Sequence, residues 1–184
     1  HIPYDANEDG FSDISQVSKF NFNPKLFYNP NQKTSLYFGA TISQENRKGG
    51  SMDKIKNQNT SLSYFLDEQE SSRIASQFSA KYKLSKKNTI TLKNSVSSFD
   101  RYINIDENIL GTSTTFGGNQ LNSFTELNFN INKETQNINI GFNSLSDIFS
   151  EKHYLSNQLR NQEYSTLGLY INHLWDISDK LAVE

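Results

Sequence analysis

The sequence predicts an all-β protein, an antiparallel up-and-down β-barrel that spans a membrane. Apolar residues recur at every second position along nearly the whole chain, while a helical stripe of apolar residues is hard to find. The alternating runs are about ten residues long or more, close to the nine to eleven residues with which a tilted strand crosses a bilayer. Short polar connections alternate with long irregular ones, as at the two ends of outer-membrane barrels.

The predicted strands share this alternation of apolar and polar residues. The clearest runs are residues 17–28, 34–44, 73–84, 89–101, 120–131, 137–144 and 164–175, with a last run beginning at Lys180. The short polar turns are residues 29–33, 85–88, 132–136 and 176–180, and the long segments are residues 1–16, 45–72, 102–119 and 145–163. We therefore expect residues 1–184 to be part of one β-barrel domain, with about eight strands of a larger barrel, short periplasmic turns and long extracellular loops.

Composition excludes several classes of protein. Only 34% of the 184 residues are hydrophobic and the mean hydropathy is -0.69, so the chain has few apolar residues with which to build an ordinary soluble core. The 18 basic and 20 acidic residues give a net charge of -2, which gives no electrostatic case for nucleic acid or for an anionic membrane surface as a partner. Cysteine is absent, which excludes disulfides, thiolate metal sites and cysteine nucleophiles.

The two faces of the predicted strands differ sharply in polarity. One face suits lipid and holds Phe20, Phe22, Leu26, Tyr28, Leu36, Phe38, Ala40, Ile42, Ile74, Phe78, Ala80, Tyr82, Leu84, Ile90, Leu92, Val96, Leu121, Leu127, Phe129, Ile131, Ile138, Ile140, Phe142, Leu167, Leu169, Ile171 and Trp175. The other face needs water or a hydrogen-bonded lumen and holds Lys, Arg, Glu, Asn, Gln, Ser and Thr at the alternate positions. Polar residues also fall on the lipid side at Ser76, Asn94, Ser123 and His173, where we expect a bulge or a shift of register.

A half-buried sheet of a soluble protein also alternates, so the position of the aromatic residues decides between the two folds. Tyr28, Tyr82, Phe129 and Trp175 all lie on the apolar face within a few residues before a short turn. They would line up as an aromatic girdle at one membrane interface. This arrangement favours the membrane barrel.

Several segments resemble TonB-dependent outer-membrane receptors of the Bacteroidetes group. They are "DANEDGFSD", "FNFNPKLFYNPNQKTSL" and "ENRKGG" near the N-terminus, and "SVSSFDRYI" and "GNQLNSFTELNF" further along. The resemblance implies a bacterial outer-membrane barrel of about 22 strands, filled by a plug domain, that takes up scarce large solutes with energy from the inner membrane. The plug and the segment that contacts TonB are missing from this chain, so we expect it to be an interior part of a larger receptor.

The N-terminal segment "DANEDGFSD" carries the most specific chemical signal. Its D-x-N-x-D-G spacing offers side-chain oxygens at alternating positions, Gly10 permits the tight turn, and calcium prefers six to eight oxygens on such a loop. The predicted ligands are Asp5, Asn7, Asp9, the carbonyl of Phe11, and Asp13 through water. Gln16 stands where a bidentate Glu would complete the loop, so affinity should be low. The alternative is a solvated acidic turn.

These observations favour a transport protein and not an enzyme. No serine has a histidine and a carboxylate at a recognisable nucleophile spacing. The leading hypothesis is the barrel wall of a TonB-dependent receptor for an iron chelate, haem, cobalamin or a glycan, with lipid, a plug domain and the TonB complex as partners. The alternatives are a complete small eight-stranded outer-membrane barrel, acting as an adhesin or anchor, and a soluble all-β carbohydrate-binding module.

Overall fold

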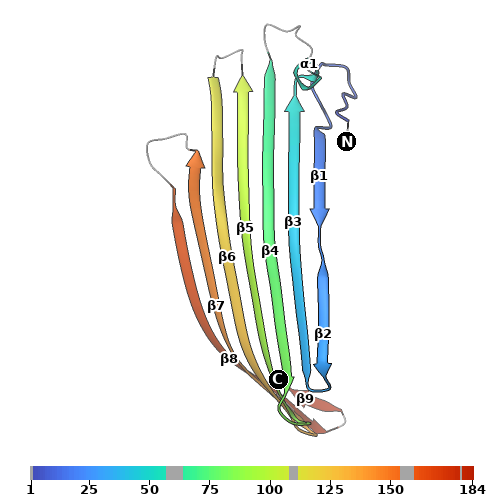
Figure 1. Ribbon diagram of the computed structural model, residues 1–184, viewed down its shortest axis with the longest axis vertical. Helices are drawn as coiled ribbons and strands as arrows, with labels where there is room; N and C mark the ends of the chain where they lie inside the picture. Colours follow the sequence, from blue (N-terminus) through green and yellow to red (C-terminus); the bar gives the residue numbers. More distant parts are fainter. Residues whose placement is uncertain (1, 57–63, 108–111, 154–159, 179) are drawn as a thin grey trace.

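The computed structural model describes residues 2–56, 64–107, 112–153, 160–178 and 180–184, and these form one long antiparallel sheet (Figure 1). Its elements are β1 (Gln16–Phe22), β2 (Lys25–Asn31), β3 (Thr34–Gly50), α1 (Met52–Ile55), β4 (Phe65–Lys83), β5 (Asn88–Glu107), β6 (Thr112–Asn132), β7 (Gln136–His153), β8 (Gln162–Ser178) and β9 (Leu181–Val183). From β3 onward each strand pairs with its neighbour in sequence. The all-β, antiparallel, up-and-down prediction is confirmed.

The strands are longer than the sequence pattern predicted. The segment 45–72, expected to be a long loop, contributes the end of β3 and the start of β4, which pair without interruption from Thr34 to Gly50. Likewise β5 continues to Glu107 and β7 to His153. The end of β3, Glu45 to Gly50, has no apolar residue, so its pairing with β4, and not its own composition, holds it extended. The end of β5, by contrast, continues the alternation with Ile103 and Ile105. The last strand begins at Leu181 instead of Lys180.

The run 17–28, predicted as one strand, is divided at Asn23 and Pro24 into β1 and β2, which both pair with β3. Proline has no amide hydrogen to give to the ladder. The carbonyl of Pro24 still accepts a bond from Ala40 N at 3.1 Å, so the chain stays beside β3 through the break.

Short turns close the strands at one end of the sheet through polar side chains. Asn31 Oδ1 accepts hydrogen bonds from the amides of Lys33 and Thr34, both at 2.9 Å. Ser85 Oγ accepts bonds from the amides of Lys87 and Asn88 at 3.1 and 3.0 Å. Asn and Ser are favoured in turns because their side chains can satisfy amides in this way. We call this the turn end of the sheet.

The strand pairing confirms the two predicted faces, because directly opposite residues in neighbouring strands point to the same side. One row across the sheet runs through Leu36, Ala80, Leu92, Leu127, Phe142 and Leu169. We call this side the apolar face and the opposite side the polar face. The pairing of β4 with β5, and of β5 with β6, has no register shift, so the bulge expected near Ser76, Asn94 and Ser123 is absent. Instead, Asn94 Nδ2 donates to Thr125 Oγ1 at 2.9 Å within the apolar face.

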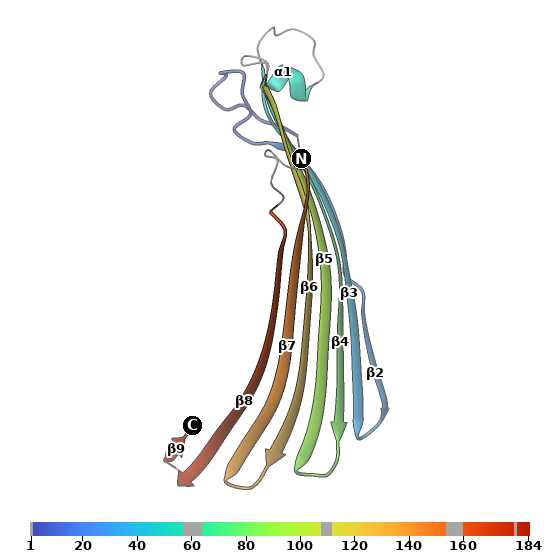
Figure 2. The ribbon, with the colours of Figure 1, turned by 90° about the vertical axis from the view of Figure 1, so that its left-hand side faces the viewer.

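Among the described residues, no second layer packs against the apolar face. In edge view the sheet is a single curved layer (Figure 2). Leu127 is 46% exposed and Leu169 is 85% exposed, while the one buried hydrophobic residue in the described part is Ile55 of α1. On β7 the apolar band extends from Ile138 to Ile148, with Ser144 and Ser146 interrupting it, about 33 Å along the strand. At the strand tilt of about 40° usual in outer-membrane barrels, this corresponds to a band about 25 Å tall, the height of their lipid-facing zone.

The four aromatic residues of the predicted girdle lie at the turn end of the apolar face. Tyr82 and Phe129 share one row, because both are paired with Ile90. Tyr28 lies opposite Leu36, which is two residues further from the turns than the row of Tyr82 and Phe129. Trp175 lies opposite Gln136, which is closer to the turns than that row. The girdle is therefore staggered from strand to strand. No helix of the described residues is long and apolar enough to cross a membrane.

Candidate functional site

The strongest candidate for a binding site lies on the polar face, toward the end of the sheet opposite the short turns. Arg73 on β4 is paired across the strands with Phe99 on β5, and its guanidinium carbon lies 4.9 Å from the centre of the Phe99 ring. Arg101 follows Phe99 on the same side of β5, and its Nη2 donates to Gln69 Oε1 at 2.8 Å. Both arginines are exposed. We call Arg73, Phe99 and Arg101 the arginine cluster.

The carboxylate nearest in the pairing pattern, that of Glu45, is already paired with other cations. Glu45 Oε2 lies 2.9 Å from Lys19 Nζ, and Glu45 Oε1 lies 3.2 Å from Arg47 Nη2. The hydrogen bond and charge of Lys19, helped by Arg47, hold the pKa of Glu45 below its ordinary value. In the described part of the chain neither Arg73 nor Arg101 forms an ion pair with a carboxylate. The cluster is therefore short of negative charge.

A small hollow of about 160 Å³ opens beside the cluster, between β3, β4 and β5. It is lined by the paired Glu45 and Arg47, and by Gln69, Ser71, Phe99 and Arg101. Guanidinium groups bind carboxylates and phosphates with two parallel hydrogen bonds, and they stack on planar rings. The arrangement can therefore hold an anionic group, with the Phe99 ring as an apolar wall beside it.

Part of this site was not predicted from the sequence. Arg73 was placed on the polar face, but apolar residues also lie on that face near the cluster, including Phe99, Phe124, Leu145 and Phe149. The signal in the sequence is a change of phase, because in "SVSSFD" and "SLSDIF" apolar residues occur on both alternating positions. Only the uninterrupted register shows that these side chains line the polar face.

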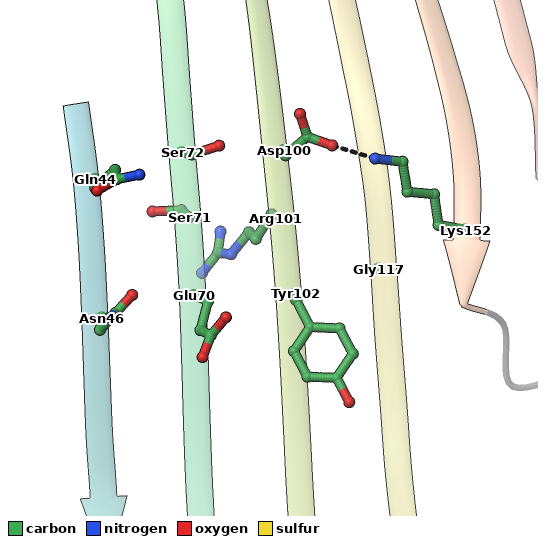
Figure 3. A pocket seen from close by; sticks show the side chains of 10 residues that line it. All are labelled: Gln44, Asn46, Glu70, Ser71, Ser72, Asp100, Arg101, Tyr102, Gly117 and Lys152. Atoms are coloured by element: carbon green, nitrogen blue, oxygen red, sulfur yellow. Dashed lines mark hydrogen bonds and ion pairs between the residues drawn. The ribbon is translucent and has the colours of Figure 1, made fainter. Parts of the chain in front are cut away.

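A second hollow, of about 380 Å³, lies beyond the apolar band on the same side of the sheet as the apolar face (Figure 3). Gln44, Glu70, Ser72 and Tyr102 line it, and an ion pair between Lys152 and Asp100 closes one side. The hydrogen bond from Lys152 holds the pKa of Asp100 below its ordinary value. In its lining Arg101 and Lys152 are balanced by Glu70 and Asp100, so this hollow has no excess of positive charge for an anion.

The predicted calcium loop packs against the end of β3. Ser12 N donates to Gly50 O at 2.8 Å, and Met52 N donates to Gly10 O at 2.9 Å. Within the loop, Asp5 Oδ2 accepts from Gly10 N at 2.9 Å and Asp9 Oδ1 accepts from Phe11 N at 2.8 Å. Gly10, with φ of 86°, supplies the left-handed turn that the D-x-N-x-D-G spacing requires.

The remaining predicted ligands of the loop form internal bonds. Asn7 Oδ1 accepts from Asp9 N at 3.3 Å, and Asp13 Oδ2 accepts from Ala6 N at 2.7 Å. Among the described residues no three His, Cys, Asp or Glu side chains are grouped so that they could hold a metal ion. The predicted set also uses an amide oxygen from Asn7 and the carbonyl of Phe11, so calcium binding stays a prediction.

Comparison with known proteins identifies the fold. No protein-family model matches the chain, and no curated protein matches it in sequence. In three dimensions it is similar to the unliganded crystal structure of the ferric citrate transporter FecA, with a TM-score of 0.63 and 8% sequence identity. The match covers 89% of this chain and 26% of FecA, so the chain spans about a quarter of the length of that transporter. The chain therefore shares its strand architecture with about a quarter of that structure.

Proposed function

We propose that this chain forms part of the wall of an outer-membrane β-barrel, in a TonB-dependent receptor that takes up a scarce anionic solute such as a metal chelate. One observation carries the proposal. A single sheet exposes an uncovered apolar band on one side and a charged face, with the arginine cluster, on the other. Lipid can cover the band while the polar face lines a lumen. The similarity in fold to FecA supports this assignment.

The alternatives fit the structure less well. A soluble carbohydrate-binding module would expose the whole apolar band to water, at a cost that rises with its area. A complete eight-stranded barrel would pair its last strand with its first, whereas in the described chain β9 pairs with β8 alone. The finer parts of the proposal, which are the plug domain, the TonB complex and the nature of the solute, follow from the resemblance in sequence and from the arginine cluster.

The proposal is tested by uptake with the full-length receptor in its native cells. We expect the receptor to sediment with the outer membrane. Replacing Arg73 and Arg101 by glutamine should raise the KM for an anionic chelate, with ferric citrate as the first probe, by about tenfold or more, because two charge-assisted bonds are lost. Replacing Lys81 and Lys83 by glutamine removes the same charge from the polar face near the turns and serves as the control.

Two results would contradict the proposal. Sedimentation with the inner membrane would exclude an outer-membrane barrel. The second result is that the wild type and the arginine variant take up anionic, neutral and cationic solutes equally well. This would show that the arginine cluster is not the binding site, but it would not contradict the barrel assignment.

A further inference from the structure

Positive charge is concentrated at the turn end of the sheet, although the whole chain carries a net charge of -2. The lysines in or beside the short turns are Lys33, Lys81, Lys83, Lys86, Lys87, Lys133 and Lys180. In the described part of this end the carboxylates are those of Glu134, Asp176 and Glu184. From composition we expected no electrostatic attraction to an anionic surface. The local excess of lysines means that the turn end can still attract one.

Some of these lysines surround a hollow at the turn end. It has a volume of about 850 Å³ and lies between the β4–β5 turn and the β6–β7 turn. Lys86, Lys87 and Lys133 line it, together with Ile131, which belongs to the apolar face. Glu134 is the single carboxylate in its lining. Three ammonium groups therefore lie around a hollow that borders the apolar band.

Backbone bonds fix the two turns relative to each other. Ser85 Oγ holds the amides of Lys87 and Asn88, and Asn132 N donates to Lys87 O at 2.8 Å. Lys133 N donates to Gln136 O at 2.8 Å and closes the second turn. Within the described residues none of the three lysines around the hollow forms an ion pair. The two turns that carry these lysines are thus held together, and Glu134 is the one carboxylate that offsets their charge in the lining of the hollow.

We propose that this hollow binds the phosphate of an anionic phospholipid in the periplasmic leaflet of the outer membrane. The ammonium groups would face the phosphate, and the acyl chains would lie along Ile131 and Phe129 of the apolar face. Lysines beside interfacial aromatic residues attract anionic headgroups in this way. Because β4 to β7 supply the whole hollow, strands elsewhere in a larger barrel would not alter its lining. The inference rests on the proposed barrel in the outer membrane.

The experiment uses the full-length receptor, purified from outer membranes in detergent with equal amounts of phosphatidylglycerol and phosphatidylcholine. Native mass spectrometry measures two fractions: receptors that retain one phosphatidylglycerol molecule and receptors that retain one phosphatidylcholine molecule. We expect the wild type to prefer phosphatidylglycerol by about fivefold or more, which corresponds to about 1 kcal/mol at a charged interface. The K86Q/K87Q/K133Q variant should lose this preference.

The matched control is K25Q/K81Q/K83Q, which removes three charges from the polar face, those of Lys81 and Lys83 near the same end, and should keep the preference. A wild type that retains both lipids equally overturns the inference, as does an unchanged preference in the first variant. An equal loss in both variants shows a general effect of charge and also overturns it. The proposed function is tested separately, because sedimentation with the outer membrane does not depend on these lysines.

Discussion

The ring of Tyr170 on β8 lies over Gly141 on β7, its partner across the strands. A side chain carbon on residue 141 would come within 2.1 Å of Tyr170 Cζ. The hydroxyl of Tyr170 reaches further, to β6, where it accepts a hydrogen bond from Asn128 Nδ2 at 2.8 Å. The glycine leaves room for the ring, and the ring ties three strands together on the polar face.

Gly141→Ala should therefore displace Tyr170 and break its bond to Asn128. We expect a loss of about 1–2 kcal/mol in the free energy of unfolding, since one packed cross-strand pair and one hydrogen bond are given up. Denaturant unfolding of the full-length protein in vesicles measures the change. Tyr170→Phe is the companion variant, because in the Gly141→Ala background it should cost almost nothing further. Full additivity of the two substitutions would show that the ring does not depend on this glycine.

A positive charge should be tolerated on one face of β6 and not on the other. Leu127 lies within the apolar band, so Leu127→Lys should lower the stability of the receptor in vesicles by about 2–4 kcal/mol, as measured for charges at the middle of barrel walls. Asn128→Lys introduces the same charge one residue away, on the polar face, and should cost far less. A similar cost for both would mean that the apolar face does not meet lipid.

Glu151 and Arg160 form an ion pair that should make the base of the β7–β8 connection sensitive to acid. The buried carboxylate of Glu151 accepts bonds from Arg160 N at 2.8 Å and from Arg160 Nη2 at 2.5 Å. The hydrogen bond from the guanidinium is the main cause that holds the pKa of Glu151 below its usual 4.5. A lowered pKa in the folded state means that the pair stabilises the fold above pH 4.5 and that this stabilisation is lost as pH falls through the lower, folded value.

Glu151→Gln should remove this part of the acid dependence. At pH 7 the variant should melt at a lower temperature than the wild type, and the difference should shrink as the pH falls below about 4.5. Melting curves of the full-length receptor across that range provide the measurement. Glu163→Gln, which changes an exposed carboxylate near the start of β8, is the control and should leave the curve unchanged. A gap that stays constant with pH would argue against titration of Glu151.

The sequence was sufficient to predict the faces of the sheet but not the length of its strands. Period-two alternation assigned Leu127 and Asn128 to opposite faces, and the pairing confirms this. The end of β3, "SQENRKGG", has no apolar alternation, so its composition resembles a loop. It is extended because each residue pairs with β4, which is a tertiary effect that local sequence does not record.

The arginine cluster could not be predicted from the sequence, because it also depends on how the strands pair. Arg73 and Arg101 are far apart in sequence, and no motif spacing joins them. They become neighbours because Arg73 pairs with Phe99, which fixes the register of β4 against β5. A shift of one residue would turn one arginine to the apolar face. The calcium loop, by contrast, is local, so its D-x-N-x-D-G spacing could be recognised directly.

We expect the N-terminal loop of the full-length receptor to bind calcium weakly. Asp5 and Asp9 already orient their carboxylates by accepting backbone amides, and Asp5 Oδ1 is buried without a hydrogen-bond partner. Titration calorimetry after chelation should give a dissociation constant of about 10⁻⁴–10⁻³ M, as in extracellular calcium modules. Asp9→Asn should weaken binding at least about tenfold, because a charged ligand is lost. Glu8→Gln changes a charge in the same loop outside the ligand pattern, so it should bind as the wild type does. If it weakens binding as much as Asp9→Asn, the loop attracts calcium only through its overall charge, and the acidic-turn alternative is correct.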